Sequence, residues 1–516
     1  MKKSLVAAGV IIALGVVWTG GAWYTGKQFE SRISEMVQQA NAQIKRTAPE
    51  SAVELGYQNY QRGVFSSQLD LVVKPVAGAA NSWLQPGQSV ILKEDVDHGP
   101  FPLASLKSFN LIPAMASVHT VLVNNDVTKH LFDLAKGQSP FDINTRISYN
   151  GDTRSAIDLK ALNYESEGEK VAFSGGNFVF EAGGDGKTYA LSGEAQSGLI
   201  DTVNEYNQKV KLTFNNLKTE GNSSLTGFDE FVGDQKVNLE KLAISVEGKE
   251  LALLEGMTLD GKSDLVNDGK TVNTQLDYTL NSLKLQGQDM GTGKLTLKIG
   301  QIDGQAWHQF SQQYNAQAQA LLAQPDLTQN PELYQQKLAD AFFGALPLLL
   351  KGDPSITIAP LSWKNSKGET SFNLSILLKD PSKATGEPKT LAESLDRTLK
   401  SLDGKLAIPM DMATEFMTQV ARIEGYQQDE AAKLAVQQVK GLAAMGQMFR
   451  LTTLENDTIG TSLQYANGQV TLNGQKMPLE DFVGMFGMPD LGIPAPAEAP
   501  APAEAPAPAP APAPAQ

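Results

Sequence analysis

The sequence predicts an α+β protein rich in β-structure. We expect an N-terminal transmembrane helix, a long antiparallel twisted sheet with several covering helices, and a disordered C-terminal tail of proline and alanine. Three observations support this fold class: an uncharged apolar segment opens the chain of 516 residues, apolar and polar residues alternate along much of 57–300, and 493–516 is almost wholly Pro and Ala. The expected boundaries are 1–26 for the anchor, 27–48 for an amphipathic helix, 49–490 for the folded domain and 491–516 for the tail.

The anchor segment, Ser4–Gly26, is 23 residues long and lies between the charges of Lys3 and Lys27. About 20 apolar residues are enough to span the hydrocarbon core of a bilayer. Lys2 and Lys3 favour a cytoplasmic N-terminus, because positive residues beside a span tend to stay in the cytoplasm. We therefore expect a single-pass protein with the bulk of its chain on the far side of the membrane.

Trp18, Trp23 and Tyr24 cluster at the far end of this segment, where aromatic side chains of an anchor meet the membrane interface. They are the residues that we expect at the membrane boundary. A cleaved signal peptide is the alternative, with Gly20 and Ala22 as the small residues before a cut. The bulky Trp18 and the apolar residues beyond Ala22 make a poor cleavage region, so we favour a retained anchor.

An amphipathic helix is expected over 27–48. Apolar residues recur there at spacings of three and four and form one stripe, which consists of Phe29, Ile33, Val37, Ala40 and Ile44. Such a stripe is typical of a helix that packs onto a folded domain. A dimerising stalk is the alternative interpretation.

From Tyr57 to about Gly300 the dominant period is two, which is typical of strands with one apolar face. Turn dipeptides separate the runs and supply the positive φ of tight hairpins; they are Asn150-Gly151, Asp185-Gly186, Asp260-Gly261 and Asp268-Gly269. Many short strands with nearby turns predict an antiparallel meander. A short helix is expected at Val127–Lys136, ending at Gly137.

Helices are expected near 306–346 and 412–449. Asn330-Pro331 looks like an N-cap followed by proline at the first helical position, and Pro347 should end or kink that helix. Strands return in 355–379 and 398–408, and a last hairpin covers 458–472. In the last predicted helix one apolar face carries Leu434, Ala435, Val439, Leu442, Met445 and Phe449.

The tail is expected to be an extended chain, because proline and alanine alone cannot form a core. Truncation after Gly492 should therefore leave the melting temperature unchanged. Differential scanning calorimetry of the full and truncated chains would test this expectation. A melting temperature several degrees lower in the truncated chain would show that the tail docks onto the domain.

Composition excludes several kinds of chemistry. The chain has no cysteine, which excludes disulfides, thiolate nucleophiles and zinc sites built on cysteine. Its net charge of −14, with no basic stripe, argues against a nucleic acid partner. No serine-hydrolase or zinc-protease motif occurs, and the four histidines lack metal-binding spacing; they are His98, His119, His130 and His308. We therefore expect no enzyme activity, no cofactor and no metal, although a carboxylate pair formed by folding stays open.

One motif matches formally: Gly256–Ser263 fits the phosphate-binding loop pattern G-x-x-x-x-G-K-[ST]. That pattern binds phosphate only where a strand ends and a helix begins. The residues that follow alternate with period two, through Val272, Thr274, Leu276 and Tyr278. We therefore interpret the match as chance, with Asp260-Gly261 at a hairpin corner and Lys262 as an exposed turn residue.

Several strings together resemble the YdgA family of Gram-negative inner-membrane proteins, whose domain has no assigned activity. They are the Met1–Ser4 start with its apolar span, Tyr60–Ser67 (YQRGVFSS), His98–Phe101 (HGPF) and Tyr465–Gly474 (YANGQVTLNG), and the likeness covers about residues 1–490. The resemblance implies a location in the cell inner membrane with the domain in the periplasm, and it implies self-association as a homodimer. It supplies no site residues.

Three functions remain open on this sequence, and the sequence favours the first of them. The first is an envelope scaffold that works through its surfaces and contacts another envelope protein. The second is a module that binds a lipid or another apolar ligand on the curved sheet, roofed by the Met-rich late helices, with Leu276 and Tyr278 as inward-facing candidates. The third is an enzyme without a recognisable motif.

Overall fold

The computed structural model describes residues 2–47, 52–77, 84–107, 109–166, 168–204, 206–322, 324, 330–386 and 388–485. Its side chains are described from Trp18 onward, except for residues 43, 46, 47, 322 and 331. This described part contains one sheet of 22 strands and nine α-helices. The predicted α+β, β-rich fold class is therefore confirmed.

One helix opens the chain, two short helices lie between the first strands, two follow the long strands, and four lie near the C-terminal end of the described sheet. They are α1 (Lys2–Thr47), α2 (Leu103–Lys107), α3 (Lys129–Leu134), α4 (Gly304–Leu322), α6 (Pro331–Leu349), α7 (Leu391–Thr398), α8 (Met410–Ile423), α9 (Gln428–Met448) and α10 (Leu479–Gly484).

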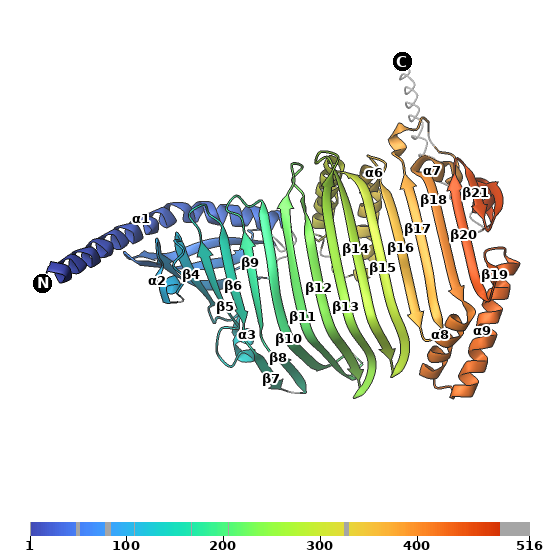
Figure 1. The fold of residues 1–516 in the computed structure, drawn as a ribbon, viewed down its shortest axis with the longest axis horizontal. Coiled ribbons are helices and arrows are strands. Elements are labelled where there is room, and N and C mark those ends of the chain that lie inside the picture. Colours follow the sequence, from blue (N-terminus) through green and yellow to red (C-terminus); the bar gives the residue numbers. More distant parts are fainter. Residues whose placement is uncertain are drawn as a thin grey trace, which may run out of the picture.

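The strands lie side by side along the long axis of the molecule (Figure 1). They are β1 (Val53–Arg62), β2 (Ser66–Pro75), β3 (Val90–His98), β4 (Ala116–Leu122), β5 (Phe141–Ile147), β6 (Thr153–Leu159), β7 (Leu162–Ser166), β8 (Glu169–Phe173), β9 (Gly176–Ala182), β10 (Thr188–Val203), β11 (Lys209–Leu225), β12 (Phe231–Val246), β13 (Lys249–Val266), β14 (Thr271–Leu285), β15 (Gln288–Asp303), β16 (Ser355–Asn365), β17 (Gly368–Leu378), β18 (Leu399–Pro409), β19 (Thr453–Glu455), β20 (Thr458–Ala466), β21 (Gln469–Leu472) and β22 (Gln475–Pro478).

Nearly every strand pairs with the next one in the chain, and all the pairings are antiparallel. The hairpin of β7 and β8 is an insertion: β6 pairs with β9, and β8 joins the far end of β10. The predicted antiparallel sheet is thus confirmed. The expectation of short strands is wrong for the centre of the sheet, where β10 to β15 are 15 to 18 residues long.

Three of the four predicted turn dipeptides form turns, at Asn150-Gly151, Asp185-Gly186 and Asp268-Gly269. Asp260-Gly261 does not, because both residues lie inside β13, where they pair with Lys236 and Gln235 of β12. Gly261 has no positive φ, and the side chain of Leu276 occupies the space above it. Gly261 does not form a turn; its lack of a side chain leaves room for Leu276 of the neighbouring strand.

Asn330 caps α6 as predicted, since its side-chain oxygen accepts a hydrogen bond from the Leu333 N–H. Pro347 was expected to end or kink this helix, but α6 continues to Leu349. The proline stands in the last turn, so it removes only one backbone hydrogen bond before the helix stops. The helices expected near 306–346 are α4 and α6, and those expected near 412–449 are α8 and α9.

The N-terminal segment forms one helix, α1, across the expected boundary between residues 26 and 27. Among the residues that the structure describes, no helix is long and apolar enough to cross a membrane. Most of the predicted anchor, residues 4–17, has side chains outside that description. The transmembrane span therefore stays a prediction, and the predicted tail, 491–516, lies wholly outside the described residues.

The described part of α1 packs on the sheet, with Phe29 and Ile33 at 4% and 5% exposure. They contact a core of side chains from β2, β3 and β4, which includes Leu69, Val96 and Val118. The amphipathic stripe allows two interpretations, a surface that packs onto the domain or a dimerising stalk. Phe29 and Ile33 pack onto the domain.

A carboxylic acid is buried among these first strands. Glu94 of β3 pairs with Leu69 of β2 and Thr120 of β4, is 4% exposed, and accepts a hydrogen bond of 2.5 Å from the Thr120 hydroxyl. Burial raises the pKa of Glu94 from 4.5 to about 7, and the Thr120 hydrogen bond opposes this only in part. The acid therefore keeps its proton in the folded protein up to near-neutral pH.

This pKa makes the stability depend on pH. The unfolded chain releases the Glu94 proton near pH 4.5 and the folded protein near pH 7, so stability is greatest below the lower value and falls as the pH rises to the upper one. Glu94→Gln removes the ionisation and should raise the free energy of unfolding by up to about 3 kcal/mol at pH 8, with little effect at pH 4. Urea unfolding at both pH values would measure this. An equal change at pH 4 and pH 8 would show that Glu94 does not titrate as described.

Candidate functional site

One face of the central sheet is apolar over many strands. Directly paired residues of neighbouring strands point to the same side of a sheet. One continuous row of paired positions runs from β12 to β16 as Val237, Leu259, Tyr278, Leu295 and Leu361. The adjacent row, two residues further along each strand, consists of Leu239, Met257, Leu280, Gly293 and Trp363. We call these ten positions the apolar strip.

The strip lines an open groove with a volume of about 430 Å³. This volume lies within the range of about 300–1,000 Å³ that is typical of small-molecule sites. Tyr278 and Leu361 remain 42% and 43% exposed, so the described residues of the chain do not cover them. A contiguous apolar surface that stays exposed on a folded protein is usually an interaction site.

Trp363 forms part of the floor of the groove. A side chain at Gly293 would collide with the indole ring, which therefore lies across the backbone of β15 at this glycine. The Trp363 indole N–H donates a hydrogen bond of 2.6 Å to the Met290 carbonyl oxygen, which fixes the ring. The strip therefore ends, on β16, in an aromatic ring that is held in place.

The opposite face of the same strands is polar. Asp260 and Asp277 pair there between β13 and β14, and Thr296 of β15 donates a hydrogen bond to Asp277. The hydrogen bonds from Thr296 and then Gln275 lower the pKa of Asp277, which keeps it ionised at neutral pH. The sheet therefore has one charged face and one apolar face, as its period of two predicts.

The three predicted interface residues lie in α1 where it meets the first strands. The Trp18 indole N–H donates a hydrogen bond of 3.2 Å to the Phe101 carbonyl oxygen, and its ring lies 5.1 Å from that of Phe65. Trp23 and Tyr24 are about half exposed, and Arg62 stacks on the Trp23 ring. Trp18 therefore contacts the domain, whereas Trp23 and Tyr24 present aromatic surface outward.

The formal phosphate-loop match has no loop geometry. Gly256–Ser263 lies wholly inside β13, and Lys262 forms an ion pair of 3.1 Å with Asp264. The interpretation of the match as chance agrees with this strand, although the predicted hairpin corner is wrong. Among the described residues no group of three or more His, Cys, Asp or Glu side chains could hold a metal ion. His119 and His308 each contact one carboxylate, of Asp142 and Glu230.

Comparisons with known proteins identify relatives over nearly the whole chain. A family model described as "Bacterial protein of unknown function (DUF945)" matches residues 1–480. The chain is 71% identical to protein YdgA of Escherichia coli strain K12 over 495 residues, which cover 96% of this chain and 99% of YdgA. It is 32% identical to the uncharacterized protein YihF of the same strain over 488 residues, or 94% of this chain and 99% of YihF.

A further relative is an uncharacterized protein of Haemophilus influenzae, 27% identical over 323 residues, which cover 59% of this chain and 84% of the relative. No solved structure matches the chain. The resemblance that the sequence motifs indicate is confirmed by the family model and by the YdgA match. The chain belongs to the DUF945 family of bacterial proteins of unknown function, together with YdgA.

Proposed function

We propose that this chain is a non-enzymatic, single-pass protein of the cell inner membrane whose periplasmic domain binds the acyl chains of lipids on the apolar strip. The observation that carries this proposal is the strip itself, with nine apolar side chains and one glycine in two paired rows over five strands. A polar ligand would find few hydrogen-bond partners there. A hydrocarbon chain needs none.

The dimensions of the strip support an acyl chain as the occupant. Five strands at a spacing of about 4.8 Å give a length of about 19 Å from Val237 to Leu361. One leaflet of a bilayer has a hydrocarbon thickness of about 15 Å, half of the 30 Å core, so the strip is long enough for one lipid chain. Each buried CH₂ contributes about 0.8 kcal/mol, so a chain on the strip should stay bound during gentle purification.

The expected anchor supports a membrane as the source of the ligand. The described part of α1 packs on β2, β3 and β4 of the same sheet that carries the strip. An N-terminal span that continues from α1 would hold this sheet close to the bilayer surface. We propose the topology with the N-terminus in the cytoplasm and the bulk of the chain in the periplasm, as Lys2 and Lys3 favour.

Gentle detergent extraction of the full chain, followed by native mass spectrometry and lipid analysis, tests the proposal. We expect an acyl lipid at a fixed ratio to protein. A fusion of residues 1–47 to an unrelated soluble domain is the control, because it carries the same anchor and its annular lipid without the sheet. Equal lipid in the two preparations would overturn the proposal.

The topology has its own expected result. Alkaline phosphatase fused after Tyr60 should be active, because this enzyme folds only in the periplasm, and the mature protein should begin at or next to Met1. The physical reason is the lysine pair before the apolar segment and the poor cleavage region after it. A mature N-terminus near Trp23 would contradict a retained anchor.

The second candidate is an envelope scaffold that binds another envelope protein or a second copy of this chain. It is favoured by the outer side of α9, where four large apolar side chains are at least half exposed: Leu442, Met445, Met448 and Phe449. Three of the six residues on the predicted apolar face of this helix, Leu442, Met445 and Phe449, are among them, whereas Ala435 and Val439 of that face are buried. The buried side of α9 carries Ala431, Ala435, Val439 and Ala443 instead. Cross-linking in intact cells would detect such a partner.

A further inference from the structure

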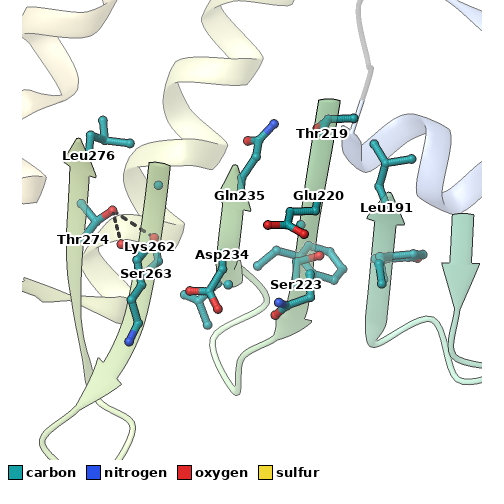
Figure 2. A pocket seen from close by; sticks show the side chains of 18 of the residues that line it. Leu191, Thr219, Glu220, Ser223, Asp234, Gln235, Lys262, Ser263, Thr274 and Leu276 are labelled. Carbon is teal, nitrogen blue, oxygen red and sulfur yellow. Dashed lines mark hydrogen bonds between the residues drawn. The ribbon is translucent and has the colours of Figure 1, made fainter. Parts of the chain in front are cut away.

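A second hollow on the apolar face of the sheet adjoins the strip. Its volume is about 350 Å³, and its lining comes from six neighbouring strands, from Phe180 of β9 and Leu191 of β10 to Thr274 and Leu276 of β14. Figure 2 shows the part of this lining from Leu191 to Leu276. Leu276 lines this hollow, while Tyr278, two residues further along the same strand, lines the strip. Two residues of a strand cover about 7 Å, so a single ligand can reach both regions.

The hollow forms because two glycines, which have no side chain, lie between bulkier residues of the sheet. Its central row of paired positions is Leu191, Gly221, Gln235, Gly261 and Leu276. Three aromatic rings stand at its β10 end, where Tyr189 stacks on Phe180 at 5.8 Å and contacts Phe231 at 5.3 Å. The hollow therefore offers aromatic faces on one side and aliphatic groups on the other.

Hydroxyl groups mark the end of the hollow that lies away from the strip. Ser263 and Thr274 are directly paired, with their hydroxyl oxygens 3.0 Å apart, and the Thr274 hydroxyl also lies 3.1 Å from the Lys262 carbonyl oxygen (Figure 2). A carbonyl oxygen can only accept, so the Thr274 hydroxyl donates to the Lys262 carbonyl oxygen and accepts a hydrogen bond from the Ser263 hydroxyl. Both hydroxyl donors are then used within the pair. What the pair offers to a ligand is the acceptor capacity of the Ser263 oxygen.

The charged side chains around the hollow point away from it. Three charged residues line the hollow: Glu220, Asp234 and Lys262. Each is next in sequence to a residue of the central row, so its side chain leaves the opposite side of the sheet, and Lys262 forms an ion pair with Asp264. The side chains on the apolar side carry hydroxyl, amide, aliphatic or aromatic groups. The net charge of the chain is −14. An anionic group in the hollow would meet no opposite charge and a repulsive overall field.

We infer that the ligand of the strip is an amphipathic lipid with an uncharged, hydroxyl-bearing head, and that this head occupies the hollow beside Ser263 while its acyl chain lies on the strip. The inference rests on the proposed function, because it assumes that the strip binds the chain. An O–H donor of the head bonds the Ser263 oxygen, and the C–H faces of the head contact Tyr189 and Phe231. A fatty-acid or phosphate head offers no such donor when ionised.

Competition binding on the detergent-solubilised full chain tests this inference. The probes are a fluorescent fatty acid as tracer, and a monoacylglycerol and a fatty acid of the same chain length as competitors at pH 8. We expect the monoacylglycerol to bind about tenfold more tightly, which is the size of one hydrogen bond plus an avoided desolvation. Ser263→Ala should remove most of this preference and leave the affinity for the fatty acid unchanged.

Ser224→Ala is the matched control, because Ser224 of β11 stands on the charged face of the same sheet. It should keep the full preference. Equal affinities of both competitors for the unchanged protein, or a preference that survives Ser263→Ala, would overturn the inference while leaving the strip as an acyl site. The absence of any bound tracer would instead contradict the proposed function itself.

Discussion

Replacing Tyr278 with glutamate should abolish acyl-chain binding. Tyr278 lies in the middle of the strip, between Leu259 of β13 and Leu295 of β15, and lines the groove. A bound hydrocarbon chain would bury the new carboxylate without a partner, which costs several kcal/mol. Because about 1.4 kcal/mol corresponds to a factor of ten, affinity for the fluorescent fatty acid should fall by about 100-fold or more.

The fold should tolerate this change, because Tyr278 is already 42% exposed in the free protein. Asn238→Glu is the matched control: it introduces the same charge on the polar face, where Asn238 pairs with Lys218 and Thr258. Control and unchanged protein should bind equally. Unaltered binding by the Tyr278→Glu protein would remove the strip from consideration as the ligand site.

The alternation of apolar and polar residues predicts which side chains of each strand share a face, and this much of the site is visible in the sequence. Leu276 and Tyr278 could be named as inward-facing residues on that basis. Strand pairing in a meander also follows from the turn dipeptides, three of which stand where β5, β9 and β13 end. Local chemistry therefore predicts the class of fold and the amphipathic character of the sheet.

The register between strands is not visible in the same way. Leu295 and Leu361 extend the row of Tyr278 because β14 pairs with β15 and β15 pairs with β16. Leu295 and Leu361 are 66 residues apart in sequence, and α4 and α6 lie between them. Trp363 joins the strip because Gly293 leaves its ring room on the neighbouring strand. Such complementarity is a property of two strands together, and a pattern within one strand does not contain it.

The sequence likewise does not show which part of the apolar face of α9 is buried. Its helical period identifies an apolar stripe, but the partner surface decides which part of that stripe is covered. The buried residues Ala431, Ala435 and Val439 recur at a spacing of four along α9, and this helix packs against α8. The larger Leu442, Met445 and Phe449 are thereby left on the outside, where they are available to a partner.

The attachment of α1 to the sheet depends on a close contact at Gly26. His98 at the end of β3 is 2% exposed; its Nδ1–H donates to the Val64 carbonyl oxygen at 3.1 Å, and its Nε2 accepts from the Ser67 hydroxyl at 2.7 Å. Burial lowers the pKa of His98, which keeps the ring neutral and fits these two roles. Thr25 donates to the Gly99 carbonyl oxygen at 2.8 Å beside it. The ring is thus held from the sheet side, directly beneath α1.

Gly26→Ala should therefore destabilise the protein and loosen α1. The added Cβ atom would lie 2.4 Å from two atoms of the His98 ring, so the helix or the ring must move. Overpacking of this kind costs about 1–3 kcal/mol, against a gain of about 1 kcal/mol from alanine in place of glycine in a helix. Gly20→Ala should have only the favourable effect of alanine on helix stability, because nothing lies within 4 Å of its added Cβ atom. Urea unfolding and hydrogen exchange of α1 should show a loss for Gly26→Ala and none for Gly20→Ala. Equal stabilisation by both substitutions would mean that α1 does not rest on His98, and that the proposed anchor would not hold the sheet at a membrane through this contact.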